Sequence, residues 1–354
     1  MNETGALLIR QLSRLSSALG NLVRHASCRN AAAGAKKACK ASVVMYLILA
    51  GLLFVLSEIA AGAEIRVLIL LSERSGAYLE VAQVIQSGLN DRHSPVSVEV
   101  TDVASFTRSG LETPMPGLLV AVGVKASEAV ARLNTHPPTL NLLIPRQSFE
   151  RLVKSSGNPD PQLFSAIYLD QPYSRQLELI RIMLPGHMRI GVLATPASRE
   201  LVKRIGLAAR QKKLQLVTRE ISPGEELIPA LQQLLPEVDV MLALPEPLIF
   251  NNANIQGILL TTYRYKTPML AFSPAYVRAG ALAALYTSSA QVGAEAAEVI
   301  SKAIAGKNSI LPPPRYPKDF SISINQQVAR SLEIIMDEEP ILYEKLRRSS
   351  EQDL

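Results

Sequence analysis

Short apolar segments alternate along the chain with longer segments of helical period. Ten of these short segments are rich in Val, Ile and Leu, and they span residues 65–71, 96–102, 118–123, 140–145, 165–170, 189–195, 214–221, 238–246, 268–273 and 281–287. Continuous apolar runs of this length are typical of strands that helices cover on both faces. The pattern therefore predicts an α/β protein whose parallel sheets are built from βαβ units.

Two of the intervening segments indicate which helix faces are buried. Apolar side chains recur at helical spacing at Tyr78, Val81, Ala82, Ile85 and Leu89, and again at Leu177, Ile180 and Leu184. Such stripes predict amphipathic helices that pack against a sheet.

The alternation is interrupted once, near residues 155–172, and restarts at Arg189. We interpret the interruption as the passage between two Rossmann-like lobes joined by a hinge, for which the 291 residues from Glu64 onward suffice. The carboxyl ends of the parallel strands would face a cleft between the lobes. A ligand is expected in that cleft.

Residues 36–63 have the composition of an export signal. Three lysines precede an apolar run at 41–57, and Ala61-Gly62-Ala63 forms an A-x-A cleavage site. We expect cleavage after Ala63 and a periplasmic location. The alternative is that residues 41–57 are retained as an anchor, because the run approaches the roughly 20 apolar residues that span a bilayer.

Residues 1–35 form an N-terminal extension with two interpretations. Leucines recur at helical spacing at Leu8, Leu12, Leu15, Leu19 and Leu22, which allows a short amphipathic helix at a membrane surface. The alternative is a start codon assigned too far upstream.

Most of the excess positive charge lies before Glu64. The whole chain has a net charge of +6, whereas the part from Glu64 onward has 30 basic and 29 acidic residues and a net charge of +1. This near-neutral part gives no reason to expect a nucleic acid as partner. Both cysteines, Cys28 and Cys39, also precede it, so it offers no disulfide, thiolate metal site or Cys nucleophile.

A family resemblance is carried by five segments, all of them in the second half of the chain. They are RIGVL at 189–193, VDVML at 238–242, KTPML at 266–270, SPAYVRAGAL at 273–282 and SISINQQVARSLEI at 321–334. In this order they resemble the substrate-binding proteins of uncharacterised ABC transport systems. The resemblance implies the type I periplasmic binding protein fold, a small-molecule ligand such as an amino acid, and an ABC permease in the inner membrane as partner.

On this pattern we assign the domains. Residues 64–168 form the N-terminal lobe, completed by about 286–312; residues 169–285 form the C-terminal lobe, completed by about 313–335; and residues 336–354 form a polar tail that frays. The chain departs from the family pattern at Lys125, where a small residue is common, and at Glu333, where Gly is expected. These departures concern the ligand rather than the fold.

Three loops that follow predicted strands open into helices, at 72–78, 123–127 and 195–198. Unpaired backbone N–H groups and the positive end of a helix dipole favour an anionic ligand group there. Arg74 or Lys125 would pair with that group, while Glu73, Asp170 or Glu246 would hold an ammonium group.

Aromatic side chains complete the predicted site. Tyr78, Tyr276 and Phe272 would cover an apolar face of the ligand. The full set of predicted ligand-binding residues is Ser72, Glu73, Arg74, Tyr78, Gly123, Lys125, Ser127, Asp170, Gln171, Thr195, Glu246, Ser273 and Tyr276.

Several of these residues have a structural alternative. Arg74 and Glu73 are equally typical of a solvated loop pair, and Lys125 of an exposed first helical turn. Tyr276 suits core packing, and Asp170 suits a capping role at the lobe crossing.

Catalysis has little support in the sequence. The four histidines, His25, His93, His136 and His187, are scattered, and no catalytic, metal or cofactor motif is present. We therefore expect a monomeric protein without cofactor or metal that captures a small polar solute by domain closure. The alternative is a membrane-tethered sensory module that binds a ligand and acts on a membrane partner.

Overall fold

The computed structural model describes residues 65–352 apart from 91–95, 110–114, 134–136, 158–159, 161, 223–225 and 307–309. The predicted N-terminal extension and signal peptide lie outside the described residues. Within the described part, no helix combines the length and apolar character needed to cross a membrane.

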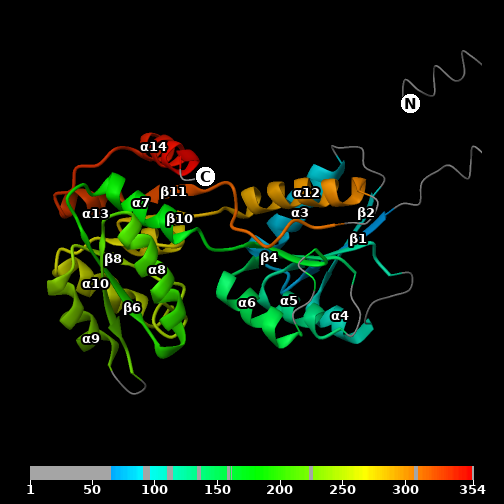
Figure 1. The fold of residues 1–354 in the computed structure, drawn as a ribbon, viewed down its shortest axis with the longest axis horizontal. Coiled ribbons are helices and arrows are strands. Elements are labelled where there is room, and N and C mark those ends of the chain that lie inside the picture. Colours follow the sequence, from blue (N-terminus) through cyan, green and yellow to red (C-terminus); the bar gives the residue numbers. More distant parts are fainter. Residues whose placement is uncertain are drawn as a thin grey trace, which may run out of the picture. The chain divides into compact units, whose positions relative to one another are not determined.

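The first sheet has five strands in the order β2-β1-β3-β4-β5, all parallel (Figure 1). The strands are β1 (Ile65–Leu71), β2 (Val96–Asp102), β3 (Leu118–Val122), β4 (Thr139–Ile144) and β5 (Phe164–Tyr168). Every residue of the central strand β3 is buried, as a strand covered on both faces requires. The edge strand β2 instead alternates between half-buried and exposed residues over most of its length.

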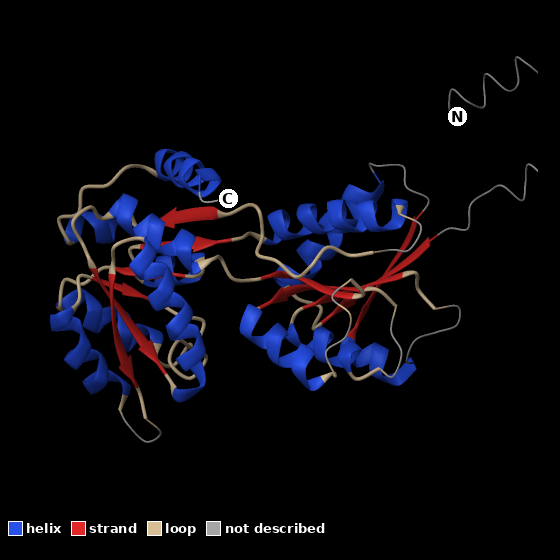
Figure 2. Cartoon of the chain, viewed as in Figure 1, coloured by secondary structure: helices blue, strands red, loops and turns tan. Residues whose placement is uncertain are grey.

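Helices cover both faces of this sheet (Figure 2). On one face α3 (Gly76–Asn90) and α12 (Ser289–Ala305) share a core with β1, β3 and β4. The other face is covered by α4 (Val103–Ser109), α5 (Val124–Ala131) and α6 (Arg146–Ser155). Helix α12 comes after five of the six strands of the second sheet in sequence, so this lobe is completed by a distant part of the chain.

The second sheet has six strands in the order β11-β10-β9-β8-β6-β7. They are β6 (Arg189–Ala194), β7 (Gln215–Glu220), β8 (Val240–Leu242), β9 (Met269–Ala271), β10 (Ala283–Tyr286) and β11 (Ser321–Ile324). The prediction of parallel sheets holds except at β11, which runs antiparallel to β10. Its alternating sequence Ser-Ile-Ser-Ile and its position at the sheet edge explain why a search for continuous apolar runs misses it.

Helices also cover both faces of the second sheet. One face carries α7 (Tyr173–Met183), α8 (Arg199–Gln211), α13 (Gln326–Ser331) and α14 (Glu339–Gln352). The other carries α9 (Leu227–Leu234), α10 (Ile255–Arg264) and α11 (Pro274–Ala279).

The predicted buried helix faces are confirmed. In α3 the residues Val81, Ala82, Ile85 and Leu89 are buried, and Tyr78 is half-buried. In α7 Leu177 and Ile180 are fully buried, and Leu184 is buried just after the helix ends.

Three chain segments pass between the two sheets, and hydrogen bonds tie them together. Gln171, after β5, donates from Nε2 to the Thr287 Oγ1 after β10 and to the Asp319 carbonyl before β11. Thr287 also donates to the Asp319 carbonyl, at 3.2 Å. Gln171 is only 2% exposed, so its amide serves as a buried connector of the crossing segments.

The predicted polar tail is wrong for residues 339–352, which form helix α14. Leu342 and Leu346 are fully buried in the core beside α7. The Ser349 hydroxyl donates to the buried Glu178 carboxylate on α7, at 2.8 Å. Polar residues dominate this segment, so its apolar face of two leucines is too sparse to recognise without the surface that it covers.

The Glu178 carboxylate joins α14 to the rest of the lobe. Its side chain is 4% exposed and lies within 2.6 Å of Arg181 Nη2 and 3.4 Å of Lys212 Nζ. Burial alone would raise the pKa of Glu178, but hydrogen bonds from Arg181 and Ser349 and the nearby lysine lower it to about 2. The carboxylate is therefore ionised and paired at neutral pH.

Glu333 occupies a backbone position that favours glycine. Its φ is 57°, directly after α13, and the Ile334 N–H donates to the Ala329 carbonyl, at 2.9 Å. This is the left-handed residue of a Schellman-type helix end. The family's expected Gly at this position thus has a conformational reason, and Glu333 keeps the same conformation at some cost.

Candidate ligand-binding site

A cleft with a volume of about 540 Å³ opens at the carboxyl ends of strands from both sheets. It is lined by the β4–α6 junction, the start of α7, the first turns of α8, the loop after β8 and Tyr316 before β11. The volume falls in the range of pockets that hold small molecules. Its walls carry basic side chains, including Arg146 and Arg204, and acidic ones, including Glu150 and Asp170.

The β4–α6 junction is shaped by a bulge at the end of β4. The register of β4 against β5 shifts between Leu142 and Ile144, and Leu143 has a φ of 50°. Pro145 is the N-cap residue of α6, and its ψ of 142° is extended rather than helical, so the helix begins at Arg146. A bulge at a strand end changes the direction of the segment that follows. Here it sets the position of Arg146.

Arg146 is held in place by contacts on two sides. Its backbone N–H donates to Asp170 Oδ2, at 2.6 Å, and its Nη1 donates to the Tyr316 hydroxyl, at 3.0 Å. The guanidinium lies over the rings of Tyr168 and Tyr316, at 5.9 and 5.4 Å from their centroids. These contacts fix the guanidinium at the cleft wall.

The Glu150 carboxylate lies between two guanidinium groups. It accepts from Arg146 Nε, at 2.7 Å, and from Arg204 Nη2 and Nη1, at 2.8 and 3.2 Å. All three side chains are about one-third exposed. Burial alone would raise the pKa of Glu150, but the hydrogen bonds from Arg204 and Arg146 hold it below its usual value. Because α6 covers the first sheet and α8 the second, this ion pair joins the two lobes.

Asp170 lines the cleft at the crossing after β5, where the sequence predicts it. Burial raises the pKa of its carboxyl to about 6, against the lowering effect of the Arg146 N–H and the charge of Arg146. A carboxyl with this pKa is ionised at neutral pH, but its surroundings in the protein stabilise the ionised form less than water does. A positively charged ligand group beside it would be stabilised.

Replacing Asp170 by asparagine should therefore change the pH dependence of stability. The folded pKa of about 6 exceeds the unfolded value of about 3.9, so the folded chain retains a proton that the unfolded chain releases. The stability from this proton is full below about pH 4 and is lost as the pH rises through about 6. We expect the unfolding free energy of wild type minus that of Asp170→Asn to fall by about 2–3 kcal/mol between pH 4 and 7 in urea titrations.

Asp239→Asn is the matched control for this measurement. Burial would raise the pKa of Asp239, but Arg189 and two backbone N–H groups lower it. The corresponding difference for Asp239→Asn should therefore rise with pH. A difference that stays constant with pH for Asp170→Asn would contradict the raised pKa.

Glu246 also lines the cleft, between Pro245 and Pro247 after β8. It is 8% exposed and accepts hydrogen bonds from the hydroxyls of Thr195 and Ser198, which follow β6. Thr195 thus holds Glu246 by a hydrogen bond and does not itself line the cleft. Two hydroxyl donors hold the carboxylate in a fixed position at the carboxyl ends of neighbouring strands β6 and β8.

Three predicted residues of the first lobe meet at the ends of β1 and β3. The Ser72 hydroxyl accepts from the Ala126 N–H, at 3.0 Å. Gly123 has a φ of 92°, and a Cβ there would lie 2.4 Å from Ser72 Oγ and 2.6 Å from the Tyr78 ring. Only glycine allows this close approach. The cluster lies on the same sheet edge as Arg146 but outside the lining of the cleft, so its contact with a ligand stays a prediction.

Four predicted residues of the same loops have local roles. Arg74 pairs with Asp102, at 2.7 Å, and the Ser75 hydroxyl donates to Glu73, at 2.8 Å. Ser127 is fully buried and donates to the Gly123 carbonyl. Lys125 is exposed on the first turn of α5. Arg74 and Glu73 are thus not a pair with each other, and none of the four lines the cleft.

The remaining predicted residues lie in the second lobe or at the crossing. Gln171 connects the crossing segments, as described above. Ser273 precedes α11, and Tyr276 packs against Phe250 and Phe272, with its hydroxyl donating to the Phe250 carbonyl, at 3.2 Å. The contacts of Tyr276 are therefore those expected if it packs in the core, which was the alternative to ligand contact. Of the full predicted set, Asp170 and Glu246 line the cleft.

Sequence reasoning missed the cationic half of the cleft. Arg146, Glu150, Arg204 and Tyr316 all line it, and none belongs to the predicted set. A signal existed for Arg146, because it follows a predicted strand and a proline just as the chosen loops follow theirs. Arg204 and Tyr316 carried no such signal, since they reach the cleft from the second turn of a helix and from an irregular segment.

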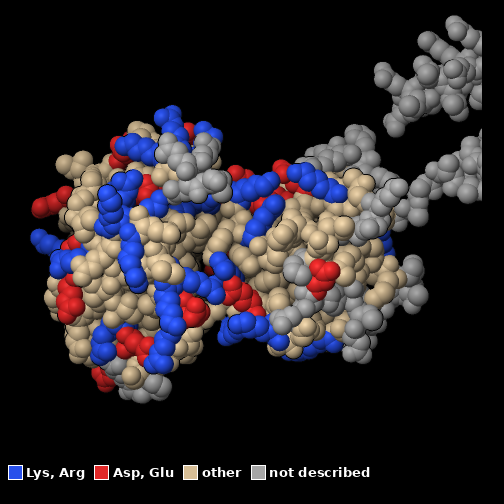
Figure 3. All heavy atoms as spheres, viewed as in Figure 1, with Lys and Arg blue, Asp and Glu red and all other residues tan. Residues whose placement is uncertain are grey.

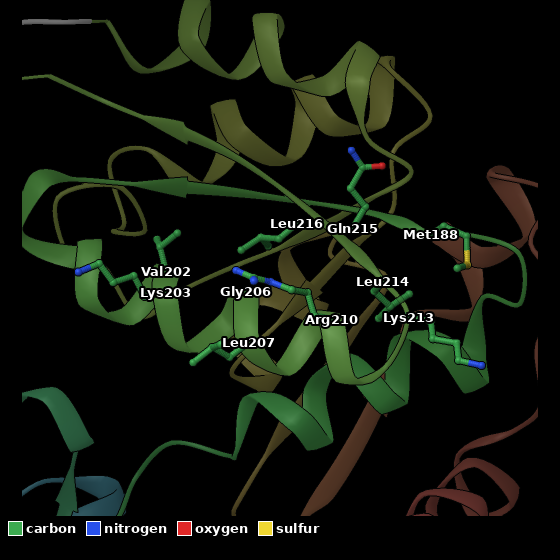
Figure 4. A pocket seen from close by; sticks show the side chains of 10 residues that line it. All are labelled: Met188, Val202, Lys203, Gly206, Leu207, Arg210, Lys213, Leu214, Gln215 and Leu216. Atoms are coloured by element: carbon green, nitrogen blue, oxygen red, sulfur yellow. The ribbon is translucent and has the colours of Figure 1, made fainter.

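A larger and shallower hollow, with a volume of about 970 Å³, lies on a different face of α8, against β7 (Figure 4). Its lining includes Leu207 and Met188, which are 58% and 45% exposed, together with three cations, Lys203, Arg210 and Lys213. Figure 3 shows Lys and Arg side chains gathered on the surface over α7 and α8. The hollow lacks the acidic groups of the cleft, so we assign the ligand site to the cleft.

Solved structures with the same fold are widespread. The complex of an ABC domain with L-Trp from Streptococcus pneumonia matches at 18% identity and a TM-score of 0.56, over 79% of this chain and 98% of that one. The ligand-free, open structure of CD0873, a substrate binding protein with adhesive properties from Clostridium difficile, matches at 16% identity and 0.63, over 77% and 96%. The arabinose binding protein AraP from Geobacillus stearothermophilus matches at 12% identity and 0.51, over 75% and 98%.

These likenesses show that the chain has the type I periplasmic binding protein fold: two α/β lobes with largely parallel sheets. The sequence pattern of one family, described as ABC transporter substrate binding protein, matches residues 113–345. The chain belongs to this family, whose members bind the substrates of ABC transporters. A comparison with curated proteins finds no match.

Proposed function

We propose that this chain is the solute-capturing component of an ABC uptake system and that it binds a small polar solute, an amino acid or a similar zwitterion, in the cleft. The supporting observation is the pairing of charges of both signs across one cleft of about 540 Å³. Arg146 and Arg204 offer donors to an anionic group, and Asp170 and Glu246 offer acceptors to a cationic one. A ligand with both charges would satisfy both sets at once.

The proposed mechanism is capture without chemistry. A solute that contacts groups on both lobes stabilises the arrangement of the lobes that permits those contacts. A membrane permease would then recognise the loaded protein, and a monomer suffices for this role. Contacts of this kind give affinities near 1 μM, or about 8 kcal/mol, when water is excluded.

The proposed location is outside the cytoplasm, after removal of residues 1–63. Sequencing of the N-terminus of the protein recovered from cells distinguishes this from the tethered sensory module. A chain that starts at Glu64 fits a freely diffusing binding protein. Retention of residues 41–57 would favour the sensory alternative.

Thermal melting with a panel of amino acids, small carboxylates and sugars tests the binding. We expect at least one zwitterionic solute to raise the melting temperature, because a ligand that binds only the folded state stabilises it by mass action. Asp170→Ala and Glu246→Ala should each weaken the affinity for that solute about tenfold or more, since each removes a charged hydrogen-bond partner.

Glu237→Ala is the matched control, because this exposed acidic residue precedes β8 whereas Glu246 follows it. Its affinity should match that of wild type. A melting temperature that no solute changes would overturn the proposed function. Unchanged affinity in both cleft variants would remove Asp170 and Glu246 from the site.

A further inference from the structure

The Glu150 carboxylate already occupies a position suited to a ligand. It lies in the cleft, and its two oxygens accept hydrogen bonds from Arg146 and Arg204, on helices that cover different sheets. Guanidinium groups prefer planar carboxylates because two parallel N–H groups match two oxygens. The geometry is therefore that of a bound carboxylate, supplied by the chain itself.

Arg146 is held independently of Glu150. The Tyr316 hydroxyl and the rings of Tyr168 and Tyr316 support its guanidinium, and Asp170 holds its backbone N–H. Loss of the Glu150 carboxylate would thus leave this guanidinium in place and short of an acceptor. A preorganised cation of this kind binds an external anion without first being ordered.

The acidic groups nearby favour a carboxylate over a more highly charged anion. Asp170, Glu200 and Glu246 line the same cleft as the two arginines. A phosphate carries up to two charges and would be repelled by these groups, whereas a carboxylate carries one and matches the group already present.

We infer that Arg146 and Arg204 form the binding site for a carboxylate of the solute, and that Glu150 is an intramolecular competitor which the solute displaces. This inference rests on the proposed function and deepens it. Each bound solute releases Glu150 from the arginines, so Glu150 lowers the affinity of the cleft for carboxylates. The same side chain keeps the two arginines paired when no solute is present.

Chemical rescue tests the site without knowledge of the solute. Glu150→Ala removes the atoms of one acetate, so acetate should bind between the arginines in this variant. At about ten times its dissociation constant, acetate should raise the melting temperature of Glu150→Ala by about 3 °C relative to sodium chloride at equal ionic strength. Wild type and Glu237→Ala, which loses an exposed acidic residue outside the cleft, should show no such rise.

Two further comparisons make the rescue specific. Acetamide, which has the same shape without the charge, should have no effect on Glu150→Ala. Glu150→Ala combined with Arg204→Ala should lose the acetate response. Arg204 is the better choice of arginine to remove, because Arg146 also packs on two tyrosine rings. An equal acetate response in wild type, or its persistence without Arg204, would overturn the inference.

The solute panel separates this inference from the proposed function. Glu150→Gln should raise the affinity for carboxylate-bearing solutes about tenfold. Glu237→Gln, which replaces an exposed acidic residue outside the cleft, should change it less than about twofold. If Glu150→Gln weakens binding, Glu150 contacts the solute directly and the inference is wrong. A further outcome is that only uncharged solutes bind and that Glu150→Gln and Arg204→Ala leave their affinity unchanged. The protein would then capture a solute, as proposed, but the carboxylate site would be wrong. If no solute binds, the proposed function fails and the acetate measurement alone decides the site.

Discussion

Replacing Leu346 by alanine is expected to lower the unfolding free energy by about 2–5 kcal/mol, because the truncation leaves a cavity in a fully buried position. Leu346 packs with α7 residues in the main core of the second lobe. Urea denaturation at neutral pH measures the loss. The effect is large for a segment that the sequence alone presents as a polar tail.

Ile341→Ala is the control for this measurement, since Ile341 lies on the same helix and is 49% exposed. Its loss should stay below about 1 kcal/mol. Two further contacts predict that α14 is an integral part of the lobe: Ser349 with Glu178, and the Tyr343 ring with that of Phe320, at a centroid distance of 4.8 Å. A Leu346→Ala loss as small as that of Ile341→Ala would show that the helix does not pack in solution.

A side chain at Gly293 is expected to separate α12 from α3. A Cβ at this position would lie 2.7 Å from Val84 Cβ and 3.1 Å from the Val81 carbonyl oxygen. Neither neighbour can yield without a shift of the helix backbone. We expect Gly293→Ala to lower the unfolding free energy by about 1–3 kcal/mol and Gly293→Val to lower it further, as overpacking does in a dense core.

Gly206→Ala provides the matched comparison, since it adds the same methyl group to a helix interior. There the nearest atom, Leu216 Cδ2, would lie at 3.7 Å, which is an ordinary contact. This variant should be unchanged or more stable by up to about 1 kcal/mol, because alanine has the higher helix propensity. If Gly293→Ala is as well tolerated as Gly206→Ala, the close approach of α12 to α3 does not exist in solution.

The α12–α3 contact matters for the architecture as well as for stability. Gly88 on α3 is similarly close to Ala297 on α12, where an added Cβ would lie at 2.9 Å. Small residues on both helices therefore allow the late helix α12 to dock on the early lobe. This docking sends the chain back across the hinge, which creates the second and third crossing segments.

The candidate site shows which of its residues can be predicted from their position in loops after strands. Asp170 and Glu246 were predicted because they follow apolar runs and the carboxyl ends of parallel strands share one edge, and both line the cleft. The same reasoning also selected Lys125 and Tyr276, which lie away from the cleft. Sequence position places a residue at an edge of the sheet, but it does not say which side chains of that edge point into the cleft.

The sequence by itself determined the α/β class, the positions along the chain of ten of the eleven strands that the structure describes, and the buried faces of α3 and α7, because these depend on the local spacing of apolar residues. It also indicated the family, through segments that resemble those of the family in their residues and in their order along the chain. The tertiary structure alone decided that α14 packs on α7, that β11 runs antiparallel to β10, and that Glu150 lies between Arg146 and Arg204. These features join residues far apart in the chain, and no local pattern encodes such contacts.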